Sequence, residues 1–282
     1  MMFYLCIDST TKKLAVNLSK DGKMVSGVSN GRDLKHMEKI MTHIDHVIRE
    51  GRIDIGSIDV LGINTGPGDF TGTRIGISII KTLSWVLDRP AYGISALDIF
   101  ALGIAHSNAK YISRSSRSGI PVIIVPCLDV RKDELYCSFY EIATEKIQTG
   151  DGKKDRYRPI SEIEIGDRNY PVINISGNHL IQKDFFIEKI SGLFRNGCFY
   201  LPDRGGRAYR DIRVILGGNC VHSYGKMLSV LASSDRRIIL DKNNMEPAGN
   251  SLNECIDFLV KGGKKPQRIN PVYVREFIPF GK

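Results

Sequence analysis

The feature that most constrains the fold is the stretch NTGPGDFTGTRIGIS, residues 64–78, which lies between the apolar runs VLGI and II. Four glycines and a proline fall between residues 66 and 76, and the residues after them have helical spacing. A strand that enters such a turn and then a helix leaves backbone N–H groups and the positive end of a helix dipole for an anion. The stretch matches neither G-x-x-x-x-G-K-[ST] nor G-x-G-x-x-G. The alternative is a tight connection in which Gly72 and Gly76, four residues apart, let two helices approach closely.

A second polar site is predicted at CIDSTTKK, residues 6–13. An acid at the end of a strand, followed by Ser-Thr-Thr and a hairpin, resembles the way that actin-like nucleotide-binding folds begin. In that interpretation Asp8 holds a magnesium-bound water, and Ser9 and Thr10 touch phosphate. The alternative is an Asx-turn, in which Asp8 bonds to its own backbone. The two stretches together give these nucleotide-site candidates: Asp8, Ser9, Thr10, Gly66, Gly68 and Thr71.

The order of the elements predicts an α/β protein of two related lobes. The DG pair at 21–22 predicts a tight hairpin, so that the chain opens with a three-strand meander. The first lobe is expected to span residues 1–105 and the second residues 106–282. The predicted strands are 3–8, 14–20, 24–30, 60–64, 122–130, 135–142, 171–177 and 213–219, and the predicted helices are 34–50, 72–88, 93–105, 179–194, 221–232 and 251–261.

The net charge of +9 is concentrated in three segments, 107–120, 146–158 and 195–213, each of which carries +3. All three are rich in Ser, Gly, Asp or Asn and lack apolar periodicity, so they are expected to be surface loops. A neutral body with basic loops suits a polyanion such as nucleic acid. The alternative is that the loops only keep the chain in solution.

A search for catalytic and metal-binding motifs finds none. The six cysteines include no C-x-x-C pair, and several lie in apolar strand-like runs, which predicts reduced core residues. The histidines form no H-x-x-x-H, and there is no G-x-S-x-G. No apolar stretch is long enough to cross a membrane, and the N-terminus is typical of a strand rather than a signal peptide. We therefore expect a cytoplasmic protein with no catalytic residue, no metal and no intrinsic cofactor.

The segment 34–50 has apolar residues at spacings of three and four, which predicts an amphipathic helix. One interpretation is that this stripe packs on the sheet of its own lobe. The other is that part of it is buried against another chain, which Met37 and Met41 favour because methionine adapts to different partners.

Four stretches together resemble the TsaB (YeaZ) family of bacterial tRNA threonylcarbamoyladenosine biosynthesis proteins. They are the opening CIDSTTKKLAVNLSKDGK, the loop GPGDFTGTRIGIS, the hairpin LDVRKDELY and the tail PVYVR. The family pattern GPGSFTGLRIG differs here at Asp69, where Ser is usual, and at Thr73, where Leu is usual. The resemblance covers residues 1–105 well, 122–142 fairly and 213–282 weakly. The segments 107–120 and 143–212 look like insertions.

The resemblance implies a two-lobed actin-like ATPase (ribonuclease-H-like) fold, with mixed sheets flanked by helices. It implies a non-catalytic scaffold that binds and activates a TsaD-like transferase, the paralogue that adds threonylcarbamoyl to tRNA. That paralogue carries an H-x-x-x-H metal motif, which this chain lacks. The glycine-rich loop would then be a relic of a nucleotide site that now shapes a pair of helices.

The family also implies an interface on the first two helices, which would pair with the transferase or with a second copy of the chain. A TsaE-like ATPase and ATP in the complex would complete the assembly. The charge of the basic loops, and not the resemblance, adds tRNA as a further partner. The interface candidates are Leu34, Met37, Ile40, Met41, Ile44, Val47, Ile77 and Lys81.

Two other functions are open at this point. One is an active ATPase or small-molecule kinase of the actin-like fold, which would use Asp8 and the loop 66–72. The other is a protease, for which the sequence offers neither a nucleophile–base pair nor a metal site.

Overall fold

The chain divides into two compact units in a computed structural model. The first unit comprises Met1–Ile99 and Pro247–Tyr273, and the second comprises Phe100–Glu246 and Val274–Lys282. The sequence predicted one boundary at residue 105, whereas here residues 247–273 rejoin the first unit. The structure describes residues 1–11, 13–31, 39–130, 134–142, 158–165, 168–182, 186, 188, 190–192, 194–195, 198–200, 208–243, 249–266 and 268–272.

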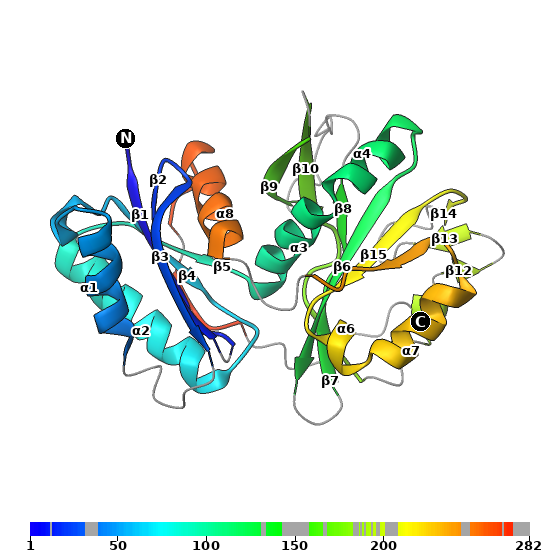
Figure 1. Ribbon diagram of the computed structural model, residues 1–282, viewed down its shortest axis with the longest axis horizontal. Coiled ribbons are helices and arrows are strands. Elements are labelled where there is room, and N and C mark those ends of the chain that lie inside the picture. Colours follow the sequence, from blue (N-terminus) through cyan, green and yellow to red (C-terminus); the bar gives the residue numbers. More distant parts are fainter. Residues whose placement is uncertain are drawn as a thin grey trace. The chain divides into compact units, whose positions relative to one another are not determined.

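The first unit is built on a five-stranded sheet in the order β3-β2-β1-β4-β5 (Figure 1). The first three strands form the predicted antiparallel meander, and β4 and β5 continue the sheet in parallel with β1. Side chains alternate between the faces, so that Leu5 and Ile7 lie on one face and Cys6 on the other. The strands are β1 Phe3–Asp8, β2 Lys13–Lys20, β3 Lys23–Gly31, β4 Val60–Asn64 and β5 Ala91–Ile94.

Helices cover both faces of this sheet (Figure 1). The helices α1 and α2 pack on the face of Leu5 and Ile7, where their apolar side chains complete the core. The helix α8 packs on the other face, where a Cβ atom on Gly62 would lie 2.0 Å from Cδ1 of Ile256. The hydroxyl of Tyr4 donates to Asp257 of α8 at 2.9 Å. The helices are α1 Ile40–Glu50, α2 Phe70–Leu87, α8 Gly249–Lys261 and the short 3-10 helix η2 Ile55–Ser57.

The second unit contains an eight-stranded sheet in which β11-β7-β6-β8-β10-β9 follow in order. The strand β15 pairs in parallel with both β6 and β16. The strands are β6 Val122–Val130, β7 Glu134–Cys137, β8 Tyr140–Ile142, β9 Arg158–Ile165, β10 Arg168–Asn174, β11 His179–Gln182, β15 Arg213–Gly217 and β16 Ile238–Leu240. Three further strands form a small sheet: β12 Phe194–Arg195, β13 Cys198–Tyr200 and β14 Ala208–Tyr209.

The faces of the large sheet again carry different helices. Val214 and Leu216 of β15 join the core with Val221 and Leu228 of the helices α6 and α7. On the opposite face, a Cβ atom on Gly217 would lie 2.6 Å from Ile104 of α3. The helices are α3 Ala96–Ser107, α4 Ala109–Arg117, α6 Cys220–Ser223 and α7 Gly225–Ser234. No helix in the described part of the chain is long and apolar enough to cross a membrane.

Several predicted elements differ from the structure, and two of them show why. The segment 107–120 was expected to be a loop, but it contains α4, because Ile112 and Ser115 are spaced to face the unit and are buried. The segment 179–194 was expected to be helical, but its first residues form β11, whose residues pair with β7 from His179 opposite Cys137 to Gln182 opposite Glu134. Ladder pairing therefore overrides the local periodicity there.

Candidate functional site

The glycine-rich loop lies against the end of β1 rather than around an open space. A Cβ atom on Gly68 would lie 2.2 Å from the carbonyl oxygen of Thr10, and the Asp69 N–H donates to that same oxygen at 2.6 Å. A Cβ atom on Gly76 would lie 2.2 Å from Oγ of Ser9. The glycines therefore let the loop and α2 approach their own sheet, whereas the sequence interpretation expected them to bring two helices together.

The N-terminus of α2 is already capped by an anion of the protein itself. Asp69 is the N-cap residue, and its Oδ1 accepts from the backbone N–H of Gly72 at 2.7 Å. Its carbonyl oxygen accepts from the N–H of Thr73 at 3.0 Å and from the Thr73 hydroxyl at 2.6 Å. A phosphate at this helix end would meet a carboxylate of the same sign. The local geometry thus favours a structural cap over an anion site.

Asp8 forms the Asx-turn that the sequence offered as an alternative. Its Oδ1 accepts from the Thr10 N–H at 3.0 Å and from the Thr10 hydroxyl at 2.8 Å. The amide of Asn64, at the end of β4, donates to Oδ2 of Asp8 and to Oγ1 of Thr10, at 2.9 Å each. Ser9 donates to the carbonyl of Gly72 at 2.8 Å. This network joins the ends of two neighbouring strands to the start of α2.

The structure places most of the predicted nucleotide-site residues together, and it adds two. Asp8, Ser9, Thr10 and Gly66 are buried at the ends of β1 and β4, whereas Gly68 and Thr71 are exposed. Asn64 and Asp69 were missed. The signal for Asn64 was its place at the end of a buried strand before a glycine turn, and the signal for Asp69 was its place just before a helix.

Four of the eight predicted interface residues are not available to a partner. The side chains of Ile40, Ile44, Val47 and Ile77 are each at most 3% exposed, and they pack in the core of the first unit. The stripe on α1 therefore packs on its own sheet, which corrects the interface prediction for these four. Met41 and Lys81 are exposed. Leu34 and Met37 lie outside the described residues.

The exposed side of α2 carries large apolar groups that the sequence interpretation did not single out. Trp85, the single tryptophan of the chain, is 85% exposed, and Phe70 is 53% exposed. The Arg74 guanidinium lies over the Phe70 ring, 3.7 Å from its centroid. Spacings of four, four, three and four residues align five exposed side chains, here called the α2 outer stripe: Phe70, Arg74, Ser78, Lys81 and Trp85.

An exposed tryptophan on a rigid helix is unusual, because tryptophan is highly buried on average. Val86, beside Trp85, is 65% exposed, and Met41 of α1 is 53% exposed. Contiguous exposed apolar patches mark sites of interaction. Phe70 and Trp85 lie on the same side of α2 and are both exposed. The α2 outer stripe is therefore the best candidate surface for a partner in the first unit. Its two cations, Arg74 and Lys81, suit a partner that also presents acidic groups.

The shifted pKa values of three described buried groups have structural causes. Burial raises the pKa of the Cys6 thiol, and it also raises the pKa of Cys127, whose thiol interacts with Cys220. Burial, with the nearby Lys39 and His46, lowers the pKa of His43. Within the described ranges, no three His, Cys, Asp or Glu side chains are grouped to hold a metal ion.

Comparisons of sequence and of structure both find similarity to proteins of the TsaB, YeaZ and TsaD group. The family TsaD, tRNA N6-adenosine threonylcarbamoyltransferase, matches residues 32–161. The tRNA threonylcarbamoyladenosine biosynthesis protein TsaB of Haemophilus influenzae is 26% identical over 156 residues, which are 55% of this chain and 60% of that protein. TsaB of Buchnera aphidicola is 34% identical over 97 residues, 34% of this chain and 46% of that protein. These matches thus span about half the length of the curated relatives.

A solved structure extends the likeness to nearly the whole chain. YeaZ from Pseudomonas aeruginosa superposes with a TM-score of 0.61 at 18% identity, covering 97% of this chain and 100% of that one. This likeness concerns the fold. It confirms the predicted α/β fold, with mixed sheets flanked by helices.

Proposed function

Because the chain belongs to the TsaB (YeaZ) family, we propose that it is a non-catalytic subunit of tRNA threonylcarbamoyladenosine biosynthesis. In this role it binds a TsaD-like transferase and shifts that enzyme toward its active conformation. The same surface pairs two copies of the chain when the transferase is absent. A TsaE-like ATPase, and ATP bound in the complex, are further parts of this proposed cytoplasmic assembly.

The observation that carries the proposal is the α2 outer stripe. Trp85 projects from a helix whose opposite side is fixed in the core by Ile77, Ile80 and Leu83, so the indole is presented on a rigid support. A rigid aromatic anchor loses little conformational entropy on binding, which is why tryptophan is enriched among the residues that dominate interface energies. The stripe is thus suited to enter an apolar pocket of a partner.

The closed glycine-rich loop supports the non-catalytic part of the proposal. Asp69 caps α2, and the Asp8 carboxylate accepts hydrogen bonds from Thr10 and Asn64. In the ATPase interpretation Asp8 would hold a magnesium-bound water, whereas here its carboxylate joins the ends of β1 and β4. The loop serves the partner surface indirectly, since it fixes the position at which α2 begins.

Trp85→Ala tests the partner surface directly. The expected result is a loss of affinity for the TsaD-like transferase from the same source by roughly 30-fold or more, about 2 kcal/mol, as for a central aromatic anchor. Binding is measured by isothermal titration calorimetry. The matched control is Val230→Ala, which removes another exposed apolar side chain, 71% exposed, from α7 of the second unit. If Trp85→Ala and Val230→Ala bind the transferase with equal affinity, the α2 outer stripe is not the surface that binds it.

Activation is tested separately from binding. The transferase is assayed for tRNA modification alone, with the wild-type chain and with the Trp85→Ala chain. We expect the wild-type chain to raise the rate and the variant to do so only at higher concentration. ATP turnover by the isolated chain that disappears in Asp8→Ala would contradict the non-catalytic proposal and favour the ATPase or kinase alternative.

A further inference from the structure

A group of cations gathers at one edge of the large sheet in the second unit. The strands β6, β15 and β16 are neighbours and run parallel, with Arg213 opposite Val122 and Val214 opposite Ile238. Parallel neighbours begin at the same edge of a sheet, so the residues that lead into these three strands lie close together there. These leading segments are 109–121, 210–213 and 235–237. All three carry positive charge.

The first segment presents its cations in one line. Lys110, Arg114 and Arg117 are spaced four and three residues apart on α4, and all three are exposed. Ile112 and Ser115 of the same helix are buried. Arg210 and Arg236 in the other two segments are exposed, and Arg213 is half-buried. These side chains are here called the edge cations: Lys110, Arg114, Arg117, Arg210, Arg213 and Arg236.

Direct contacts connect the three segments. Burial raises the pKa of the Tyr111 hydroxyl of α4, and the nearby charge of Arg213 opposes that rise. The Arg213 N–H donates to the carbonyl of Pro121 at 2.9 Å. The N–H of Val214 donates to the carbonyl of Arg237 at 2.9 Å. The edge cations therefore belong to one surface and not to three separate loops.

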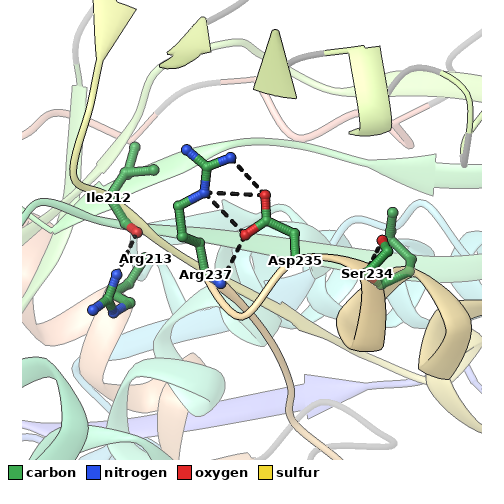
Figure 2. A network of polar contacts seen from close by, with 6 residues as sticks. Ile212, Arg213, Ser234, Asp235 and Arg237 are labelled. Atoms are coloured by element: carbon green, nitrogen blue, oxygen red, sulfur yellow. Dashed lines mark hydrogen bonds and ion pairs between the residues drawn. The ribbon is translucent and has the colours of Figure 1, made fainter. Parts of the chain in front are cut away.

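Few acids balance this charge. Figure 2 shows that the carboxylate of Asp235 faces Arg237, whose Nε donates to its two oxygens at 2.9 and 3.0 Å. This pairing lowers the pKa of Asp235, and the pair adds no net charge to the surface. Asp211 is the exposed acid among the three leading segments. Glu162 and Glu164 are exposed on β9, which also contacts α4, so the cationic surface ends on that side.

The composition of the surface distinguishes between anionic partners. Five of the six edge cations are arginines, whose planar guanidinium groups match phosphate with paired hydrogen bonds. Helices that lie on membranes also present large apolar side chains. Among the described residues of 109–121, 210–213 and 235–237, no large apolar side chain is exposed. The surface thus favours a nucleic-acid backbone over a lipid headgroup layer.

We propose that the edge cations form a binding surface for the phosphate backbone of RNA. The surface lies where the parallel strands begin, and it uses residues of the basic segments 107–120 and 195–213. The choice of RNA over DNA rests on the proposed function, because a subunit of a tRNA-modifying assembly meets tRNA. The contact itself depends only on the charges described and requires no transferase.

The test measures binding by the isolated full-length chain. The probes are a fluorescein-labelled unmodified tRNA transcript, a DNA duplex of similar length, and vesicles of phosphatidylcholine and phosphatidylserine. The test variant is Lys110→Gln/Arg114→Gln/Arg117→Gln, in which glutamine keeps a good helix former. The matched control, Lys226→Gln/Arg89→Gln/Arg268→Gln, removes one lysine and two arginines that are exposed elsewhere. A second test variant, Arg210→Gln/Arg236→Gln, probes the other two segments without touching α4.

The proposal expects tRNA binding that weakens with salt. Each lost phosphate contact reduces the slope of log K against log salt by about 0.7 to 0.9, so the α4 variant should lower it by roughly 2 to 3. Its affinity should fall at least about tenfold at 0.1 M salt, whereas the control should bind almost as the wild-type chain does. Circular dichroism and thermal melting of the α4 variant verify that it is folded.

Other results would overturn the proposal. If both test variants bind tRNA with the affinity and the salt dependence of the wild-type chain, the edge cations are not the binding surface. Equal binding of the DNA duplex and tRNA would remove the assignment to RNA, and vesicle binding without tRNA binding would assign the surface to lipid. Because Trp85 is absent from this surface, its variant separates the two proposals. Loss of transferase binding with tRNA binding retained leaves this inference standing, and the reverse leaves the proposed function standing.

Discussion

At the scale of single residues, the glycine-rich stretch depends on positions where a side chain has no room. Gly68 and Gly76 allow the loop and helix to contact Thr10 and Ser9 directly. Asp69 then uses both its carboxylate and its carbonyl oxygen to begin α2. These short-range contacts fix where the helix starts, and hence where its exposed side chains lie.

Gly68→Ala should destabilise the chain by about 1–3 kcal/mol, because overpacking against backbone forces the loop away from the sheet. The nearest atom to the added Cβ, 2.2 Å away, is the carbonyl oxygen of Thr10, which cannot rotate aside. The free energy of unfolding in urea measures the effect. Gly56→Ala is the control, since nothing lies within 4 Å of its Cβ position, and it should change stability by no more than about 0.5 kcal/mol. Equal effects at the two sites would contradict the described packing.

His43 makes stability depend on pH. Burial, followed by the charges of Lys39 and His46, lowers its pKa in the folded chain, so the unfolded chain binds a proton more readily. The contribution of neutral His43 to the free energy of unfolding is therefore complete above the unfolded pKa of about 6.5. That contribution is lost as the pH falls below this value. Urea midpoints at pH 7.5 and 5.5 should differ less in His43→Asn than in the wild-type chain. The exposed His46 gives the control variant, His46→Asn, and the same flattening in that variant would contradict this assignment.

Contacts between residues near each other in the sequence could be predicted, whereas long-range contacts could not. The Asx-turn of Asp8 spans two residues, and local chemistry predicts it. The hydrogen bond from Asn64 joins positions 56 residues apart, and only the parallel pairing of β1 with β4 brings them together. Trp85 and Phe70 could have been singled out as large apolar residues off the core stripe of α2. Their exposure, however, depends on which side of the helix packs on the sheet.

At the scale of elements, local patterns predicted the meander, the hairpin from β6 into β7, and the helices α1, α2, α3 and α8. They did not predict which sheet α8 covers, because its apolar stripe suits either unit. In the structure α8 contacts β1 through β5 and belongs to the first unit. The serine-rich α4 was missed for a related reason, since its short apolar side is visible only against a sheet.

Ile256→Ala should therefore weaken the first unit although residue 256 follows the whole second unit in the chain. The side chain is fully buried between α8 and Gly62, and its truncation should cost about 2–5 kcal/mol. Hydrogen exchange followed by mass spectrometry should show faster exchange in β1 and β4, with β6 and β15 little changed. Faster exchange confined to β6 and β15 would contradict the placement of α8.

Across the whole molecule, the two proposed binding surfaces lie on different units. In the two proposals, the α2 outer stripe of the first unit binds a protein partner and the edge cations of the second unit bind RNA. The Asp8 network is buried within the first unit. The fold class followed from the order of strands and helices. The partner surface could not be predicted in this way, because the sequence does not show which residues of a helix are buried. Ile44 and Ile77 are buried, whereas Met41 and Lys81 on the same helices are exposed.

The most direct test of the central claim is the mass of the complex in solution. Size-exclusion chromatography with light scattering is run on the chain alone, on the TsaD-like transferase from the same source, and on their mixture. We expect a new peak at the mass of a mixed complex, which is retained with Val230→Ala and lost with Trp85→Ala at the same concentration. If the mixture gives only the separate proteins, or if Trp85→Ala forms the complex as well as Val230→Ala does, the claim that this chain binds the transferase through α2 is contradicted.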